Sequence, residues 1–213
     1  MQQFRLDIFF NLSIIIPALV GIYVFRSIKK EYRYFILTIF AGTLLEYIAE
    51  FNVFNYFLFD TIYSILCTQL VLLLYFKWDT EKVADYKKII THCLVFVLVL
   101  IDQYYDYLST YHIKWALISC MVGISFYGIR LLTQGQNNLI STKESLSRKL
   151  IIIPYMVFSV YYAAINILMY YLYNADTRLI FLDLYNVIRW INFLSYISYT
   201  LALLWAPKKE KFL

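Results

Sequence analysis

The sequence predicts an all-α membrane protein: a polytopic transmembrane bundle of about seven helices, with its N-terminus outside and its C-terminus in the cytoplasm. Three observations predict this fold class. The chain is unusually apolar for its length, its apolar residues gather in seven windows, and its basic residues lie on alternate connections between those windows.

The composition excludes an ordinary soluble domain. Of the 213 residues, 62% are hydrophobic and 15% are charged, whereas a soluble domain is about half apolar and a quarter charged. A water-soluble fold of this size has no interior large enough to hold so much apolar surface, so we expect the excess to face lipid. Because seven spans of roughly 20 residues fill most of the chain, residues 1–213 are expected to form a single transmembrane helical domain.

The first apolar window follows the residues MQQFRLD and contains no small-residue cleavage site. We therefore expect it to be retained as a helix, since a cleavable signal peptide has a basic start and a shorter apolar stretch. Most later windows are joined by short connections, which favours helices that pack in sequence order. The predicted spans lie near residues 8–25, 34–50, 61–76, 89–108, 113–132, 150–172 and 182–205.

The placement of lysine and arginine sets the predicted orientation. Of the 19 basic residues, all but Arg5, Lys114, Arg178 and Arg189 fall in four groups, within 26–33, 77–88, 130–149 and 208–211. Cytoplasmic connections retain Lys and Arg, so these four groups are expected to lie inside and the multi-pass protein is expected in the plasma (inner) membrane. The acidic residues show the opposite distribution, with more of them on the predicted outer side than on the cytoplasmic side. The net charge of +5 therefore reflects a dipolar membrane protein in contact with membrane lipids and excludes a basic nucleic-acid binder.

Residues 133–148 (TQGQNNLISTKESLSR) form the longest polar stretch, on the predicted cytoplasmic side. The spacing of Ser141 and Glu144 matches a capping box, so a helix is expected to begin there and to lead into the sixth span. This segment is either a plain connector or the docking surface for a membrane or cytoplasmic protein partner.

Two ionisable residues are expected deep in the membrane. Glu46 lies about 18 Å from the cytoplasmic start of the second span, at 1.5 Å per residue, and Arg189 reaches a similar depth in the seventh. Buried ionisable groups in membranes usually pair, so a Glu46–Arg189 ion pair is predicted. Glu50 follows Glu46 at i+4 and shares its face. The pair has two interpretations: it fixes helix packing, or it belongs to a binding site or relay.

Further polar residues, repeated at helical spacing on three helices, are expected to surround this predicted ion pair. On the seventh helix, an arc of about 120° at roughly 100° per residue contains Asn186, Arg189 and Asn192. We expect this arc to face Glu46. The third helix shows a weaker stripe of Asp60, Ser64, Thr68 and Tyr75. The sixth helix carries the most coherent stripe, consisting of Tyr155, Ser159, Tyr162, Asn166, Tyr170 and Tyr173. Either hydrogen-bonded packing or a cavity open to the outside accounts for the candidate ligand-binding set of Glu46, Glu50, Tyr162, Asn166, Asn186, Arg189 and Asn192.

Several functional classes do not fit the residues. The last helix has no lysine for a retinal Schiff base, and the two histidines, His92 and His112, lie near opposite membrane faces. Neither GxSxG nor HExxH occurs, and the three cysteines all fall in apolar runs. We therefore expect no catalytic residue, no metal site and no cofactor. The topology matches a three-plus-one-plus-three sugar-transporter plan, in which spans 1–3 and 5–7 would be parallel repeats. Such transporters use prolines in corresponding helices of both halves, whereas Pro17 and Pro154 of this chain lie in non-equivalent helices.

Two segments carry a resemblance to a known group. The runs FNYFLFDTIYSILCTQLVLLLYF and IRWINFLSYISYTLALLWAPKK resemble small uncharacterised seven-helix bacterial integral membrane proteins, over about a third of the chain. Where that group often has a glutamate in the third helix, this chain has Gln69. The resemblance implies a fold and a membrane location, and no activity.

Three functions remain open after these exclusions. The first is a receptor-like or accessory protein that binds a small or lipidic ligand from the outer side. The second is a small-solute transporter or channel. The third is an intramembrane lipid hydrolase that uses Glu46 and Glu50 as acid and base. The absence of catalytic motifs favours the first.

Overall fold

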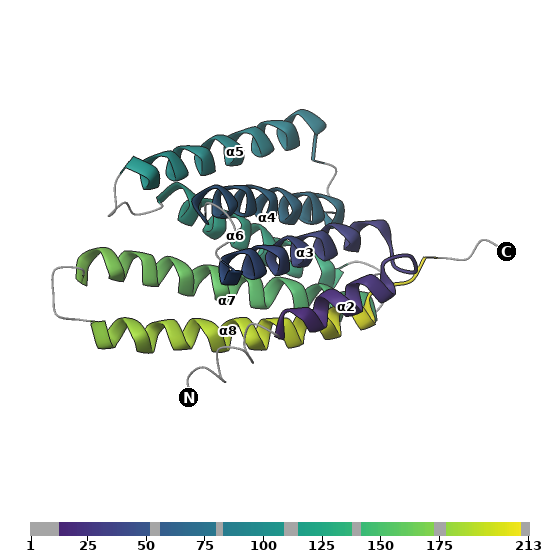
Figure 1. The fold of residues 1–213 in the computed structure, drawn as a ribbon. Coiled ribbons are helices and arrows are strands. Elements are labelled where there is room, and N and C mark those ends of the chain that lie inside the picture. Colours follow the sequence, from purple (N-terminus) through teal and green to yellow (C-terminus); the bar gives the residue numbers. More distant parts are fainter. Residues whose placement is uncertain are drawn as a thin grey trace.

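The computed structural model describes residues 13–51, 56–79, 83–108, 115–137, 142–172 and 178–209. Within these ranges the fold is all-helical, as predicted, and no β-strand is formed (Figure 1). The helices are α2 (Ile15–Val24), α3 (Lys30–Phe51), α4 (Tyr56–Trp78), α5 (Asp85–Leu108), α6 (Trp115–Asn137), α7 (Thr142–Leu172) and α8 (Arg178–Trp205).

Each predicted window falls on one of these helices, and five of the helices are long and apolar enough to cross a membrane: α4, α5, α6, α7 and α8. Helix α2 is a shorter apolar helix, and residues 8–12 of the first predicted span lie outside the described part of the chain. Helix α3 has 22 residues, which at 1.5 Å per residue gives about 33 Å. The side chains of its last six residues, 46–51, also lie outside the described part.

Six helices form a closed ring. Consecutive helices run in opposite directions (Figure 1), and contacts link α2 to α3, α3 to α4, α4 to α6, α6 to α7, α7 to α8, and α8 back to α2. Helix α5 packs against α4 and α6 from outside this ring. The interior of the bundle is therefore built from three helices that precede α5 and three that follow it.

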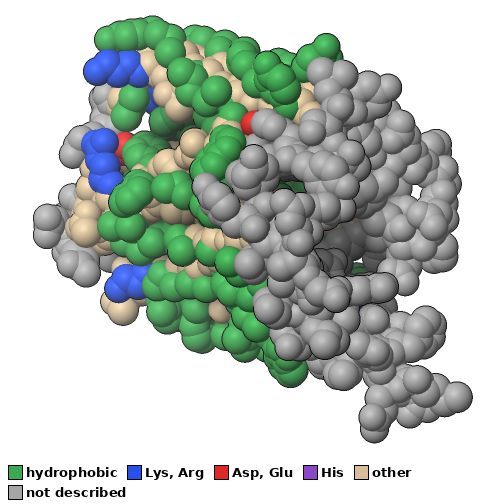
Figure 2. Space-filling model, turned by 90° about the vertical axis from the view of Figure 1, so that its left-hand side faces the viewer, with side chains coloured by type: hydrophobic (Ala, Val, Ile, Leu, Met, Phe, Trp, Pro, Cys, Tyr) green, Lys and Arg blue, Asp and Glu red, His purple; other side chains and the backbone are tan. Residues whose placement is uncertain are grey.

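The outer surface of α5 illustrates why this bundle needs lipid around it. Ile90, Leu94, Val97 and Ile101 are each at least 44% exposed, and their spacing of three or four residues places them on one face. Val95 and Val99 on the opposite side are buried against the bundle. Figure 2 shows a surface covered mainly by hydrophobic side chains, with the visible Lys and Arg side chains gathered at one edge.

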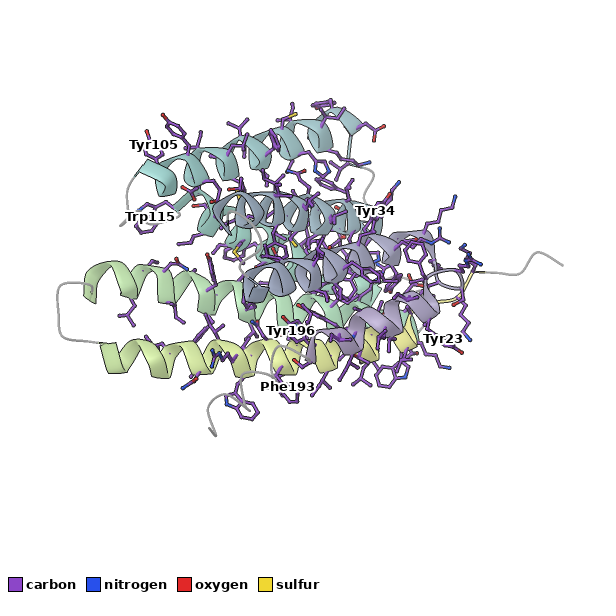
Figure 3. All side chains as sticks on the ribbon, in the orientation of Figure 1. Tyr23, Tyr34, Tyr105, Trp115, Phe193 and Tyr196 are labelled. Atoms are coloured by element: carbon purple, nitrogen blue, oxygen red, sulfur yellow. The ribbon has the colours of Figure 1, made fainter. Side chains whose placement is uncertain are left out.

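The two ends of the bundle differ in charge. At one end lie the α2–α3 turn, the last turns of α4, α6 and α8, and the first turns of α5 and α7; we call it the basic end. Tyr105 and Trp115 lie at the opposite end, whereas Tyr23 is near the basic end (Figure 3). The basic end carries Arg26, Lys29, Lys30, Arg33, Lys77, Lys87, Lys88, Arg130, Lys143, Arg148, Lys149, Lys208 and Lys209.

The polar segment 133–148 is largely helical. Residues 133–137 end α6 and residues 142–148 begin α7, while 138–141, including Ser141 of the expected capping box, lie outside the described residues. Helix α7 thus begins before the predicted span at 150. Its 31 residues give about 46 Å at 1.5 Å per residue, so its first turns extend beyond a hydrocarbon core of about 30 Å.

Candidate functional site

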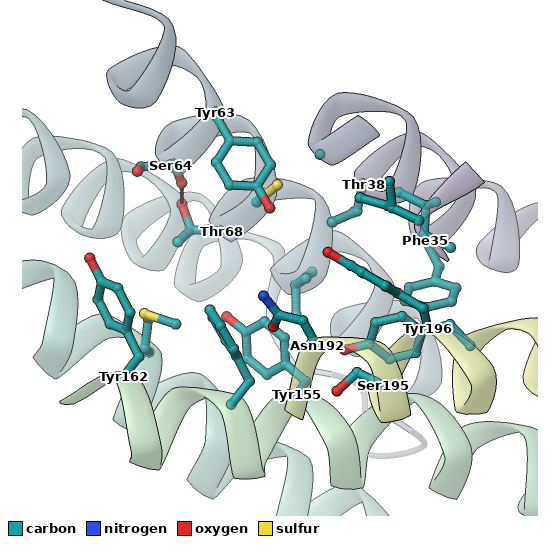
Figure 4. Close-up of a pocket in the computed structure, with 18 of the residues that line it drawn as sticks. Phe35, Thr38, Tyr63, Ser64, Thr68, Tyr155, Tyr162, Asn192, Ser195 and Tyr196 are labelled. Carbon is teal, nitrogen blue, oxygen red and sulfur yellow. Dashed lines mark hydrogen bonds between the residues drawn. The ribbon is translucent and has the colours of Figure 1, made fainter. Parts of the chain in front are cut away.

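The ring of helices encloses a cavity of about 580 Å³. Its wall comes from α3, α4, α6, α7 and α8, with Ile14 contributed from just before α2, and α5 supplies none of the described lining residues. Figure 4 shows side chains from α3, α4, α7 and α8 converging on this space. The volume is within the range of about 300–1,000 Å³ that is typical of sites for drug-sized ligands.

Aromatic rings dominate the wall. Two phenylalanines and six tyrosines line it: Phe35, Tyr63, Tyr75, Tyr155, Phe158, Tyr162, Tyr196 and Tyr199. Phe35 and Tyr199 meet edge to face at a centroid distance of 4.9 Å. Gly42 leaves room for the Tyr63 hydroxyl, since a Cβ added there would lie 3.3 Å from it. Such a wall offers flat apolar surface together with hydroxyl groups.

The smaller hydroxyl side chains of the wall donate to their own helices. Thr38 donates to the Tyr34 carbonyl at 3.0 Å, Thr68 to the Ser64 carbonyl at 2.7 Å and Ser195 to the Ile191 carbonyl at 2.7 Å. Because each hydroxyl proton is used in this way, these oxygens retain only acceptor capacity for a ligand. Ser64, a fourth such side chain, accepts from Gln103 Nε2 at 3.5 Å. Donors to a ligand therefore come from the Ser64 hydroxyl, the tyrosines, Asn192 and Arg189.

The cavity brings together three of the residues predicted from sequence: Tyr162, Arg189 and Asn192. Arg189 is the one charged residue among the described lining residues. Two others lie elsewhere. Asn166 donates from Nδ2 to the Tyr162 carbonyl at 2.8 Å and is not part of the described lining, and Asn186 is exposed on α8.

Glu46 and Glu50 belong to α3, but their side chains lie outside the described residues. The Glu46–Arg189 ion pair therefore stays a prediction. Arg189 itself lines the cavity.

The stripes predicted on two helices account for part of the wall. Ser64, Thr68 and Tyr75 of α4 line the cavity, and Tyr155 of α7 does as well. Ser159, on the same α7 stripe, is fully buried and donates to the Tyr155 carbonyl at 2.8 Å. Sequence reasoning missed Thr38, Tyr63, Cys67, Tyr196 and Tyr199. The spacing of Tyr196 and Tyr199 from Asn192 by four and seven residues was an available signal.

A packed aromatic layer separates the cavity from the basic end. Tyr32, Tyr75 and Trp78, which we call the aromatic layer, are at most 2% exposed. The Trp78 ring lies 5.4 Å from the Tyr32 ring and 6.0 Å from the Tyr75 ring. Arg148 covers Trp78, with its guanidinium carbon 5.3 Å from the ring centroid, and donates to the Trp78 carbonyl at 3.3 Å.

Glu144 holds this layer in place from α7. Its carboxylate accepts hydrogen bonds from Lys29 Nζ at 2.9 Å and from Arg148 Nη2 at 2.7 Å. Next to it, the Ser147 hydroxyl donates to the Ala202 carbonyl of α8 at 2.8 Å. Charge-assisted bonds thus join the α2–α3 turn, α4 and α7 at the basic end, and a neutral hydrogen bond joins α7 to α8.

Among the described residues, no group of three or more His, Cys, Asp or Glu side chains is placed to hold a metal ion. Comparisons with protein-family models, with curated proteins and with solved structures find no match to this chain. The resemblance to small seven-helix bacterial membrane proteins stays a prediction.

Proposed function

We propose that this chain is a seven-span plasma-membrane protein, with its N-terminus outside and its C-terminus in the cytoplasm, that binds a small amphipathic ligand within its bundle from the outer side. The observation that carries the proposal is the tyrosine-lined cavity of about 580 Å³ with Arg189 in its wall. Ionisable residues at membrane depth are costly, and they usually serve a ligand, ion or proton path.

The charge difference between the ends of the bundle supports this orientation. Lys and Arg gather at the basic end, the side that the positive-inside rule assigns to the cytoplasm. The aromatic layer lies between the cavity and this end, and its side chains are almost completely buried. Entry from the opposite, outer end is therefore favoured over a continuous pore.

The wall chemistry supports a ligand with an apolar body and one oxygen-bearing head. Tyrosine and phenylalanine rings suit an aliphatic or aromatic body. The Arg189 guanidinium and the Asn192 amide supply donors, and a guanidinium suits carboxylate or phosphate oxygens. We therefore expect a head that accepts hydrogen bonds, rather than an ammonium group.

A panel of amphiphiles with one chain and different heads tests this proposal. The full-length protein in neutral-lipid nanodiscs would be heated with decanoate, decanol or decylammonium. A ligand at a hundred times its Kd adds about 2.7 kcal/mol to the free energy of unfolding, so we expect decanoate to raise Tm clearly and decylammonium to leave it unchanged. No change in Tm with any of the three would contradict the proposal.

Two variants make this test specific to the cavity. Arg189→Gln should remove the preference for decanoate, because it removes the cationic donor from the wall. Asn186→Ala, on the exposed side of the same helix, should keep the wild-type response. An equal decanoate effect in Arg189→Gln and wild type would place the binding elsewhere.

A second candidate is a small-solute transporter. Helix α5 lies outside a ring of three preceding and three following helices, an arrangement compatible with two repeats around a central site. Proteoliposomes loaded with a sugar or an organic acid test this function by measured uptake. Uptake that Arg189→Gln abolishes while the protein stays folded would support transport. The absence of flux for every tested solute would contradict transport as the function.

A further inference from the structure

A second hollow, separate from the cavity, lies on the outer surface between α2 and α3 at the basic end. It has a volume of about 410 Å³ and is lined by Ile22, Tyr23, Phe25, Arg26, Leu37 and Phe40. None of these residues lines the central cavity. We call it the α2–α3 groove.

Cationic side chains lie toward the basic end of this groove, and apolar side chains lie farther along it. On α3, Lys30, Arg33, Leu37 and Phe40 follow one another at intervals of three or four residues and therefore share a face. Arg33 and Phe40 are separated by roughly 10 Å along the helix axis, at 1.5 Å per residue. Ile22 of α2 precedes Arg26, which lies in the turn after this helix, by four residues, so an apolar and a cationic side chain follow each other here as well. The groove thus runs from a cationic rim into an apolar floor.

Backbone contacts bring further cations to the rim. The segment after α8 lies against the α2–α3 turn, where Lys29 N donates to the Pro207 carbonyl at 3.0 Å and Lys209 N donates to the Ser27 carbonyl at 2.7 Å. An isolated bridge also joins Ile28 and Lys208. Arg26 lines the groove, and Arg33 stacks on its lining residue Phe25. We use the term cationic rim for these two residues together with Lys30, which precedes Arg33 by three residues, and with Lys208 and Lys209, whose backbone meets the α2–α3 turn.

The rim cations differ from Lys29, Lys88 and Arg148 of the basic end in having no acidic partner among the described residues. Lys29 and Arg148 are paired with Glu144, and Lys88 is paired with Asp85. Among the described residues, none forms a hydrogen bond or ion pair with the five rim side chains. The Arg33 guanidinium stacks on Phe25, with its carbon 5.1 Å from the ring centroid, and its Nε is buried without a hydrogen-bond partner.

We propose that the α2–α3 groove binds an anionic phospholipid of the leaflet at the basic end, with its phosphate between Arg26 and Arg33 and an acyl chain along Ile22, Leu37 and Phe40. A lipid fits both halves of the groove, because its phosphate neutralises the rim and its chain covers the apolar floor. The guanidinium forks bind phosphate oxygens in pairs. A soluble anion would leave the exposed floor uncovered.

Native mass spectrometry of the full-length, detergent-solubilised protein tests this assignment. We expect phosphatidylglycerol to remain bound to the wild type and phosphatidylcholine of the same chain length to dissociate. Arg26→Gln/Arg33→Gln should weaken phosphatidylglycerol retention by about ten-fold or more, as expected for the loss of charge-assisted bonds. The control Lys87→Gln/Lys88→Gln removes the same charge from α5, which packs against α4 and α6 and lines no part of the groove, and should retain the lipid.

Two further measurements separate a lipid from other anions. Leu37→Trp fills the apolar floor and keeps every rim charge, so it should also reduce retention. Soluble glycerol phosphate should fail to displace the bound lipid. Equal retention of the two lipids by the wild type, equal losses in both double variants, or displacement by glycerol phosphate would overturn the proposal. Because the groove and the cavity share no residue, failure here leaves the proposed function standing.

Discussion

Lys29 and Glu144 form an ion pair of 2.9 Å that ties the α2–α3 turn to the first turn of α7. The residues are 115 positions apart, and Glu144 also accepts from Arg148 at 2.7 Å. The Glu144 side chain is 10% exposed and the Lys29 side chain 40%, so the carboxylate is largely shielded from solvent while the ammonium group is partly exposed. Through Arg148, the pair also supports the aromatic layer beneath the cavity.

The first prediction is that Glu144→Gln destabilises the protein. The change leaves Lys29 and Arg148 without their shared carboxylate, and we expect the free energy of unfolding to fall by about 1–3 kcal/mol. The control is Asp85→Asn, which removes a carboxylate that is 91% exposed and pairs with Lys88. That change should leave the free energy of unfolding nearly unchanged, because solvent screens an exposed pair. Unfolding in nanodiscs would measure both, and equal shifts would contradict the prediction.

The second prediction concerns the close approach of α6 and α7 at Gly128. A Cβ at this position would lie 2.8 Å from Ile152 Cγ2 and 3.3 Å from the Tyr75 hydroxyl. We therefore expect Gly128→Val to force the two helices apart and to cost about 1–3 kcal/mol of unfolding free energy. At Gly123 on the same helix, an added Cβ meets nothing within 4 Å. Gly123→Ala should be neutral or stabilising, and the thermal unfolding midpoints of the two variants would be compared.

The third prediction concerns Asp102, whose buried carboxylate accepts a hydrogen bond from Leu117 N in the first turn of α6. It therefore caps α6 from a neighbouring helix and interacts favourably with the helix dipole. Asp102→Ala should lower the free energy of unfolding by about 1–2 kcal/mol, and Asp102→Asn, which keeps an acceptor oxygen, should cost less. Hydrogen exchange of the first amides of α6 should increase in the same order, more in Asp102→Ala than in Asp102→Asn. An identical loss in both variants would exclude a capping role.

The fourth prediction places the two ends of the bundle on opposite sides of the membrane. With the three native cysteines replaced by serine, Lys208→Cys should react with a membrane-impermeant maleimide only after the cells are opened. Tyr105→Cys, exposed at the other end, should react in intact cells. Labelling of both from the same side would refute the orientation that positive charges predict.

Helix positions were predictable because apolar runs and charged connections are properties of local sequence. The capping-box spacing of Ser141 and Glu144 likewise predicted a helix that leads into the sixth span, and α7 begins at Thr142. The packing of its first turns was not predictable, because Glu144 and Ser147 are buried by contacts with Lys29 and with Ala202. Those partners lie far away in the sequence, and no local pattern identifies them.

The cavity was predictable only in part, for a related reason. Helical spacing correctly placed Tyr162, Arg189 and Asn192 on inward faces. Asn186 shares the α8 arc in sequence but lies on an exposed part of the helix, since the packing partner decides where an inward face ends. The contribution of Thr38 and Tyr63 depends on the close packing of α3 and α4 around Gly42, which periodicity does not reveal.

The contact between α2 and α8 has a consequence for how the molecule is made. These are the first and last helices of the described chain, and their meeting completes the ring. During synthesis the earlier helices form only an open arc, in which Arg189 has not yet arrived and no enclosed space exists. The proposed ligand binding therefore requires α8 to be in place, and a nascent chain stalled before α8 is expected to be incapable of it.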